Sequence, residues 1–520
     1  MNPRSIFTAD SYFPKLRENN GVYIDKTALI YQMTHRDWAF FLSRPRRFGK
    51  SLLVSTLEAY FQGRKELFTG LAMEKLEQDW TPHPVLCFDM SGTRYTKIED
   101  LEERINLQLL RYEEIYGRNP EAGKLPTSRL NDLIRRAKAQ TGQNVVILVD
   151  EYDAPLLDTV VDTETFRQMR NMLRSFYSPL KESGEHLRFV FLTGITKFSQ
   201  LSIFSELNNL CTISMDERYT TICGITEAEI REYLHPEVEA MAEKHGLNFE
   251  EMMLELKEKY DGYHFTKNCP DIYNPYSLLN CLEVQELNNY WFSSGTPSHL
   301  TEMLSNYSLL KPEYLEGFYA TVDDFDTPTE SAESTIPILY QSGYLTIKGN
   351  KGVRYILGFP NNEVRLGFLK GLFPYYAKCS KNYISIFLSK LTLALEERNV
   401  EEAMQELRKF FSTIPYDVVR RRDEDFYKTI FYMTFYLATA FDVRTEERTA
   451  GGRSDVVVET QDSVYVFEFK LHGTSESALK QIEEKGYAIP YENGSKKLYK
   501  IGACFDDELR TLKDWIVVEA

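Results

Sequence analysis

The stretch GGRSDVVVETQDSVYVFEFK, residues 451–470, contains two runs of β-forming residues joined by a short turn. We predict strands over Asp455–Thr460 and Ser463–Lys470, with Gln461-Asp462 as a two-residue loop. Valine, tyrosine and phenylalanine fill positions on both faces of this hairpin. A sheet that is apolar on both faces lies in the interior of a domain, so the hairpin is predicted to be the centre of a fold.

Three charged side chains share one face of the predicted hairpin. In this register Asp455 lies directly opposite Glu468, with Cβ atoms about 5 Å apart, and Lys470 joins them because strand side chains alternate faces. The two carboxylates repel each other, and a divalent cation such as Mg²⁺ would relieve that repulsion. Asp455 and Glu468 are therefore candidate metal ligands, with Lys470 as a candidate catalytic group for metal-assisted hydrolysis. The alternative, a surface Lys–Glu pair, is disfavoured by the apolar faces.

The elements around the hairpin complete a compact domain. We predict a helix over 426–441, a strand over 442–447, a helix over 475–487 and a strand over 497–504, which gives the order αβββαβ. The segment resembles the PD-(D/E)XK nuclease superfamily, in the form that follows an N-terminal AAA-ATPase-like domain in bacterial proteins. The residues that carry the resemblance are Asp423-Glu424-Asp425-Phe426-Tyr427, Gly452-Arg453-Ser454-Asp455, Phe467-Glu468-Phe469-Lys470, Gln481 and Lys485-Gly486-Tyr487-Ala488.

That resemblance implies a restriction-endonuclease-like fold and a set of site residues. Asp455 and Glu468 would hold Mg²⁺ or Mn²⁺, Lys470 would be catalytic, and Glu424 would complete the acidic cluster. Gln481 would lie on the helix beside the site. The family often has His after the Phe-Tyr pair, where this chain has Lys428, so no catalytic role is predicted for that position.

A second informative stretch lies between an apolar strand and a helix predicted to start near Leu52. Its sequence is Arg44-Pro45-Arg46-Arg47-Phe48-Gly49-Lys50-Ser51. This is the context of a phosphate-binding P-loop. Gly49 would allow close backbone approach, Lys50 would reach the β- and γ-phosphates, and Ser51 would bind Mg²⁺. Arg46, Arg47 and Phe48 complete the candidate ATP-binding set. Whether either arginine contacts phosphate directly or across a subunit contact is left open.

The stretch Asn144–Glu151 is a buried β run that ends in two acids, as in a Walker B motif. Asp150 would hold Mg²⁺ through water, and Glu151 would be catalytic by polarising the attacking water. A strand over 188–193 ends in Thr193, where an AAA-type sensor group lies beside the γ-phosphate. A core strand with a solvated acidic turn is the alternative for 144–151. Alternating strands and helices predict a doubly wound α/β domain.

These N-terminal residues resemble the AAA-ATPase-like family. The matching segments are Tyr23-Ile24-Asp25-Lys26-Thr27, the loop 44–51, Asp150-Glu151-Tyr152-Asp153-Ala154-Pro155, Thr193-Gly194-Ile195-Thr196-Lys197-Phe198 and Phe204-Ser205-Glu206-Leu207-Asn208-Asn209-Leu210. A standard P-loop has Gly where this chain has Arg44, and the resemblance implies that this arginine is a trait of the family.

The predicted organisation has four parts: an ATPase domain over 1–225, a helical lid and middle region over 226–335, a winged-helix-like region with linker helices over 336–410, and the nuclease-like domain over 411–520. The winged helix rests on a helix over 336–341, strands over 343–347 and 353–357, and a turn at 349–352. Few basic residues line it, so packing is favoured over DNA binding. We also expect 390–411 to be helical.

Length, composition and charge limit the number of domains, the compartment and the partners that are expected for the chain. A length of 520 residues predicts several domains. The N-terminus has no apolar core of a signal peptide and no segment is long enough to span a membrane, so we expect a cytoplasmic protein without membrane contact. Seven scattered cysteines fit a reducing compartment. The net charge of −16 argues against broad coating of nucleic acid but leaves room for a local basic groove at Arg420-Arg421-Arg422.

Together these features predict an ATP-binding, ATP-hydrolysing protein coupled to a metal-dependent nuclease. Nucleic acid is the expected partner, with DNA favoured over RNA, and the ATPase domain could support a homo-oligomer. One alternative is a nucleotide-dependent switch or scaffold whose nuclease-like domain binds nucleic acid without cleaving it. Another is a scaffold in which the atypical P-loop binds no nucleotide.

Overall fold

The computed structural model describes residues 6, 11–159, 162–196, 210–291, 317–326, 335–414, 424–438, 442–445, 448–449, 452–453, 456–471, 473–492, 494–506 and 511–520. The chain divides into two compact units, Met1–Ser308 with Gly317–Arg365, and Leu309–Glu316 with Leu366–Ala520. The four predicted parts and the boundaries between them remain predictions.

A parallel five-stranded sheet forms the centre of the first unit. Its strands are β1 (Ala39–Ser43), β2 (Val85–Asp89), β3 (Val145–Asp150), β4 (Leu187–Gly194) and β5 (Cys211–Thr212), in the order β2-β3-β4-β1-β5. The strands β3 and β4 match the predicted strands over 144–151 and 188–193 to within one residue, and β1 is the apolar strand predicted before Arg44. Because all strands are parallel, their carboxyl ends share one edge, and β4 separates β1 from β3.

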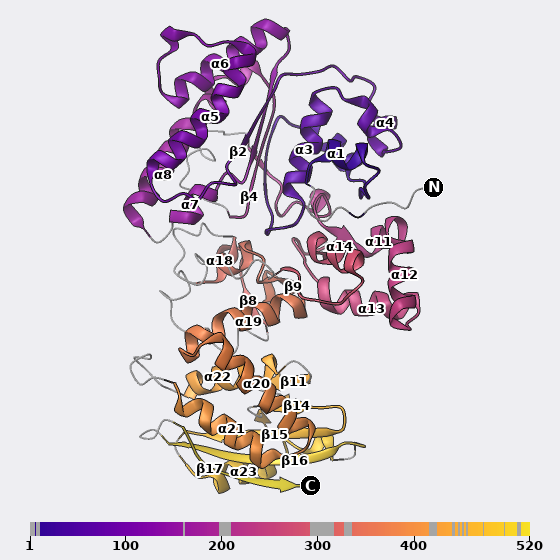
Figure 1. Cartoon of the computed structure of the whole chain (residues 1–520), viewed down its shortest axis with the longest axis vertical. Coiled ribbons are helices and arrows are strands. Elements are labelled where there is room, and N and C mark those ends of the chain that lie inside the picture. The colour runs from indigo at the N-terminus through magenta and orange to yellow at the C-terminus, as the bar shows by residue number, and fades with distance from the viewer. Residues whose placement is uncertain are drawn as a thin grey trace. The chain divides into compact units, whose positions relative to one another are not determined.

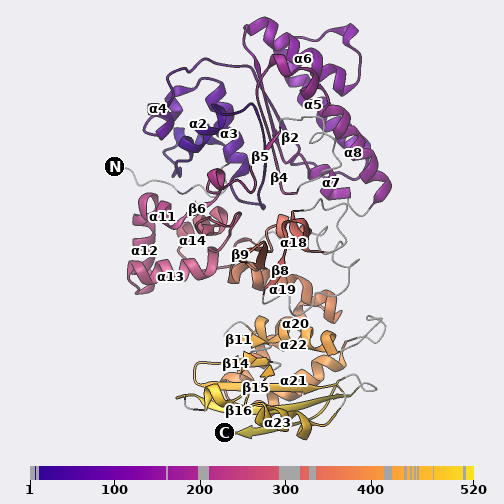
Figure 2. The ribbon, with the colours of Figure 1, turned by 180° about the vertical axis from the view of Figure 1, so that it is seen from behind.

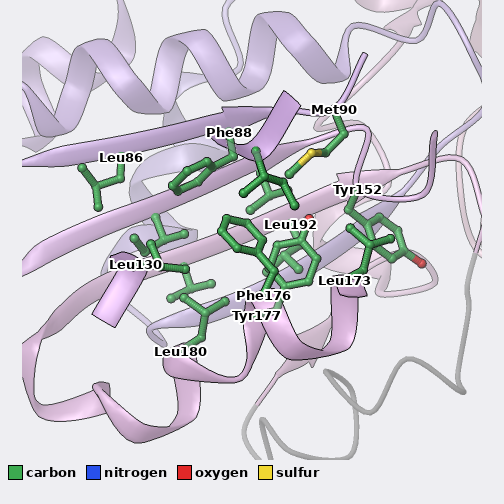
Figure 3. Close-up of a cluster of buried hydrophobic side chains, with 14 of the residues drawn as sticks. Leu86, Phe88, Met90, Leu130, Tyr152, Leu173, Phe176, Tyr177, Leu180 and Leu192 are labelled. Atoms are coloured by element: carbon green, nitrogen blue, oxygen red, sulfur yellow. The ribbon is translucent and has the colours of Figure 1, made fainter. Parts of the chain in front are cut away.

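Helices cover both faces of this sheet (Figures 1 and 2). The helices on one face are α5 (Ile98–Tyr116), α6 (Pro126–Thr141) and α8 (Thr163–Tyr177), with the short α7 (Ala154–Thr159) and α9 (Pro179–Glu182) beside them; on the other face are α1 (Phe13–Glu18), α2 (Thr27–Thr34), α3 (Lys50–Phe61) and α4 (Ala72–Leu76). Apolar residues at helical spacing, such as Leu101, Ile105 and Leu109, turn one side of α5 to the sheet. Figure 3 shows the resulting core, where the ring centroids of Phe88 and Phe176 lie 5.4 Å apart.

The rest of the first unit is a helical cluster and a small antiparallel sheet. The cluster contains α11 (Glu227–Tyr233), α12 (His235–His245), α13 (Phe249–Tyr260) and α14 (Pro275–Val284), with a two-stranded ribbon of β6 (Ile225–Thr226) and β7 (Ile272–Tyr273). The sheet has the order β8-β10-β9 and comprises β8 (Phe318–Ala320), β9 (Thr346–Lys351) and β10 (Arg354–Gly358), beside α17 (Val322–Phe325) and α18 (Ile336–Gln341). The helical stretch predicted from about Glu227 to Tyr260 is therefore present.

The predicted winged-helix segment differs in detail from the structure. Helix α18 has the predicted bounds, but β9 starts at Thr346 rather than at residue 343. The hairpin turns at Gly352-Val353, where Gly352 has a φ of +65° in the left-handed region that glycine favours. The third strand, β8, was not predicted. A helix followed by an antiparallel pair is thus present, while its assignment as a winged helix stays a prediction.

The second unit is a mixed sheet with helices on both faces. Its strands are β11 (Asp442–Thr445), β14 (Val456–Glu459), β15 (Ser463–Lys470), β16 (Lys497–Asp506) and β17 (Thr511–Glu519), in the order β11-β14-β15-β16-β17, with a separate ribbon of β12 (Arg448–Thr449) and β13 (Gly452–Arg453). Its helices are α20 (Lys381–Glu396), α21 (Val400–Ser412), α22 (Glu424–Leu437) and α23 (Ser475–Glu484); α19 (Asn362–Ala377) precedes them. Only β15 and β16 are parallel neighbours.

The predicted register of the hairpin formed by β14 and β15 is confirmed where the structure describes it. Val456 pairs with Phe467, and Thr460 and Ser463 close the predicted two-residue loop. Phe467 packs against α22, where its ring lies 5.0 Å from that of Phe435, whereas Val466 packs with α23 on the other face. Both faces are therefore buried, as the sequence predicted.

Two expectations for this unit need correction. The segment 390–411 is helical in two pieces, because the chain turns at Arg398, which has a φ of +61°, and Asn399 caps the second helix. Strand β17, which pairs with β16 along its length, was not predicted. The order αβββαβ is thus extended by one edge strand.

Candidate functional site

The loop between β1 and α3 curls around the side chain of Lys50. Gly49 has a φ of +88° and precedes the first residue of α3, so the chain turns directly into a helix whose N-terminal N–H groups face the loop. The Lys50 ammonium, on a residue that is 4% exposed, donates hydrogen bonds to the carbonyl oxygens of Arg44 and Pro45, each at 3.0 Å. The loop therefore has the backbone form of a phosphate-binding turn.

Two carboxylates at the end of β3 lie near this loop. The side chain of Ser51 lies close enough to the Asp150 carboxylate to interact with it, although β4 lies between β1 and β3. Burial raises the pKa of Asp150 and of Glu151, while the charge of Lys50 lowers both. The structure thus brings together four residues that the sequence had placed about 100 positions apart: Lys50, Ser51, Asp150 and Glu151.

Thr193 and Phe48 have packing roles in the structure. Thr193 is fully buried and its hydroxyl donates to the Leu42 carbonyl at 2.9 Å, which joins β4 to β1. The ring of Phe48 is buried, with its centroid 4.7 Å from that of Tyr263. Their predicted places beside a nucleotide stay predictions.

Sequence reasoning gave no role to Asp153, which fastens two loops at the carboxyl edge of the sheet. This fully buried carboxylate accepts hydrogen bonds from the backbone N–H groups of Ile195 (2.9 Å) and Thr196 (2.7 Å) and from the Thr196 hydroxyl (2.7 Å). It therefore links the loop after β3 to the loop after β4. The available signal was an acid set among apolar residues, three positions after Asp150.

In the second unit, Glu468 and Lys470 lie on β15 as predicted and meet Gln481 of α23. Glu468 is 2% exposed, and its carboxylate accepts hydrogen bonds from the Gln481 amide and, at 3.4 Å, from the Lys470 ammonium. Lys470 also donates to the Gln481 carbonyl oxygen, and the Gln481 amide contacts the Tyr487 hydroxyl at 3.3 Å. The carbonyl oxygen and the NH₂ group of the Gln481 side chain thus hold Lys470 and Glu468, respectively, in place.

Two predicted members of this site fall outside the described residues. They are Asp455 and the side chain of Glu424, whose backbone begins α22. The described part of the chain holds no group of three or more His, Cys, Asp or Glu side chains suited to a metal ion. Of the helices that the structure describes, none combines the length and apolar character needed to cross a membrane.

Comparison with known proteins finds a family for each end of the chain. Residues 9–204 match the AAA-ATPase-like family, described as a predicted AAA-ATPase, and residues 422–515 match the PD-(D/E)XK nuclease superfamily. The chain is 35% identical over 520 residues to an uncharacterized protein in the vnfD 5′ region of Azotobacter chroococcum mcd 1, a match that covers 97% of each protein. No solved structure matches the chain. The chain therefore belongs to the family that joins an N-terminal AAA-ATPase-like domain to a C-terminal PD-(D/E)XK nuclease superfamily domain.

Proposed function

We propose that this protein binds and hydrolyses ATP in its first unit and cleaves phosphodiester bonds of nucleic acid, DNA in preference to RNA, in its second. The observation that carries the first activity is the loop that curls around Lys50 at the N-terminus of α3, with Ser51 close enough to Asp150 to interact with its carboxylate. A hydroxyl and a carboxylate near a helix N-terminus are the donor set that Mg²⁺–ATP takes in P-loop proteins.

In the ATPase half, each side chain has a separate task. Lys50 supplies a positive charge at the loop, where the ammonium would exchange its loop carbonyl partners for phosphate oxygens. Glu151, whose pKa is raised by burial, is placed to accept a proton from the attacking water. Mg²⁺ held by Ser51 and Asp150 would neutralise charge on the phosphate oxygens.

In the nuclease half, Gln481 fixes the positions of Glu468 and Lys470. The Lys470 ammonium is placed to orient a water or to stabilise charge on the scissile phosphate. Glu468, with Asp455 and Glu424 as its proposed partners, would hold Mg²⁺ or Mn²⁺, and the ion would lower the pKa of a bound water. The buried carboxylate beside a lysine fits that donor set, because carboxylate oxygens are the preferred ligands of both ions.

ATP binding is tested by the melting temperature of the full chain with and without ATP and Mg²⁺, and hydrolysis by release of phosphate. We expect ATP to raise the melting temperature, since a ligand that binds only the folded state stabilises it. Lys50→Ala should abolish that rise and the hydrolysis, while the exposed control Lys65→Ala should retain both. A wild-type protein that neither responds to ATP nor releases phosphate would exclude the ATPase assignment.

Nuclease activity is tested on circular and linear DNA and on RNA, with Mg²⁺ or Mn²⁺ and with or without ATP. Glu468→Gln and Lys470→Ala should each lose cleavage, whereas Lys497→Ala, an exposed lysine on β16 paired with Glu519, should cut like the parent. If all variants cut equally, the activity is contamination and the domain binds nucleic acid without cleaving it. A cleavage rate that is unchanged by ATP, by ADP and by Lys50→Ala would rule out coupling between the units.

A further inference from the structure

The P-loop contains three arginines, and the structure separates their roles. We infer that Arg46 contacts the terminal phosphate of ATP bound in its own chain, while Arg44 and Arg47 hold the loop in shape. This inference rests on the proposed ATPase function and adds to it the residue that distinguishes ATP from ADP.

Arg44 is committed to the protein interior. It is 2% exposed, and its guanidinium donates to the carbonyl oxygens of Ser43 (3.0 Å) and Ser214 (2.7 Å) while lying 3.9 Å from the centroid of the Phe265 ring. Its backbone N–H donates to the Gly194 carbonyl at 3.2 Å. These contacts fix the side chain of Arg44 at the position where a standard P-loop has glycine. The side chain would have to leave the core to reach a nucleotide.

Arg47 points toward the helical cluster instead. Its Nη1 donates to the carbonyl oxygens of Tyr290 (3.1 Å) and Trp291 (3.3 Å), and its guanidinium carbon lies 3.9 Å from the centroid of the Tyr276 ring. Its φ of +65° is uncommon for a residue with a side chain. Such a conformation persists where surrounding contacts fix it, and these contacts fasten the loop to α14 and the segment that follows.

Arg46 lies between these two anchored residues and is exposed. Within the described parts of the chain, its guanidinium makes no hydrogen bond or ion pair. Arg46 directly follows Pro45, whose carbonyl oxygen accepts a hydrogen bond from the Lys50 ammonium at 3.0 Å, so its backbone lies beside that ammonium. Among the three arginines of the loop, Arg46 is therefore the one whose guanidinium has no bonded partner among the described residues, and its backbone lies next to Lys50.

A guanidinium in this place suits the γ-phosphate. Its planar fork binds two phosphate oxygens at once, which an ammonium cannot do. Beside the Lys50 ammonium, a second cation would add to the positive charge available as the terminal phosphate is transferred. Contact with the γ-phosphate is absent for ADP, so Arg46 affects turnover more than ADP binding.

The test compares Arg46→Ala, Arg46→Lys and Arg47→Ala in the full chain by melting temperature, ADP affinity, kcat and KM. We expect Arg46→Ala to keep the parental melting temperature and ADP affinity but to lower kcat by about 100-fold or more. Arg46→Lys should recover only part of that loss, since it restores charge without the fork. Arg47→Ala should instead lower the melting temperature, because it removes the contacts to Tyr276, Tyr290 and Trp291.

Mixing Arg46→Ala protein with Lys50→Ala protein tests whether Arg46 acts within its own chain. No recovery of hydrolysis is expected, whereas recovery would show that Arg46 acts on the nucleotide of a neighbouring copy and would overturn the inference. Parental kcat in Arg46→Ala, or an equal loss of melting temperature in the Arg46 and Arg47 variants, would overturn it as well. A wild-type chain without ATP binding refutes the proposed function itself, which separates that failure from these.

Discussion

Asp261, the residue that follows α13, provides a quantitative test of how this protein responds to pH. It is 1% exposed, and neither of its carboxylate oxygens accepts a hydrogen bond from any residue that the structure describes. Its pKa is raised to about 7, mainly by burial and also by the charges of Asp271 and Glu227, while the nearby backbone N–H of Gly262 and the charge of Lys257 oppose the rise. Asp261→Asn replaces the carboxylate with a neutral group of nearly the same shape.

The sign and size of the effect follow from linkage. The unfolded chain releases this proton near pH 3.9, whereas the folded chain retains it until about pH 7. The folded state therefore binds more protons between these values, and the free energy of unfolding falls as the pH rises through this window. A difference of about three pH units corresponds to roughly 4 kcal/mol above pH 7. Asp261→Asn should be close to the parent at pH 4.5 and roughly 2–4 kcal/mol more stable at pH 8.

Differential scanning calorimetry from pH 4.5 to 8 measures this difference, since two units need not melt together. The transition of the first unit should rise by roughly 5 °C in Asp261→Asn at pH 8 relative to the parent. Glu255→Gln, an exposed acid on the same helix, is the matched control and should show the parental pH profile. An equal stability difference at every pH would refute the reasoning, because it would mean that Asp261 is ionised throughout.

Three further substitutions test the packing of each unit. Gly194→Ala would place a Cβ 2.4 Å from a buried carboxylate oxygen and should lower the stability of the first unit by about 1–3 kcal/mol, whereas Gly184→Ala, with open space around it, should be neutral in the same melting assay. Arg129→Met should lower the stability of the first unit by about 3–5 kcal/mol, because it leaves the buried Glu113 carboxylate without the two hydrogen bonds that Arg129 donates at 6% exposure. Adding Glu113→Leu should restore most of that stability. Parental stability in Arg129→Met would contradict a buried ion pair. Phe431→Ala should remove about 3–5 kcal/mol from the second unit and leave the melting of the first unit unchanged, and a shift of both transitions would argue that they unfold together.

The elements with strong local signals were predictable. The loop and the register of the β14–β15 hairpin follow from the two apolar runs on either side of Gln461-Asp462. The ends of β1 at Ser43 and of β3 at Asp150 follow from the polar residues after them. Strand β17 escaped prediction because Lys513 and Asp514 adjoin in sequence and break the alternation. A register shift after Cys504 also makes the pairing of β17 with β16 irregular, so a simple alternation of residues does not predict it.

The roles of the loop arginines could not be predicted, because their partners are remote in sequence. Arg44 meets Phe265 and Arg47 meets Tyr276, both more than 200 positions away. The sequence Arg44-Pro45-Arg46-Arg47 carries no information on which side chain turns inward. The same holds for Gln481, whose helix was predicted while its contacts with both Glu468 and Lys470 depend on the packing of α23 against β15.

The position of β4 between β1 and β3 has a consequence for synthesis on the ribosome. In this sheet β1 hydrogen-bonds only to β4 and β5, which lie about 140 residues or more further along the chain. At about 5–20 residues per second, the apolar segment Ala39–Ser43 remains without its strand partners for roughly 7–30 s after it is made. During that interval its exposed edges could pair with other chains. The loop that curls around Lys50 is thus among the last parts of the first unit to form, and nascent chains that stop before Leu187 should depend on chaperones for solubility.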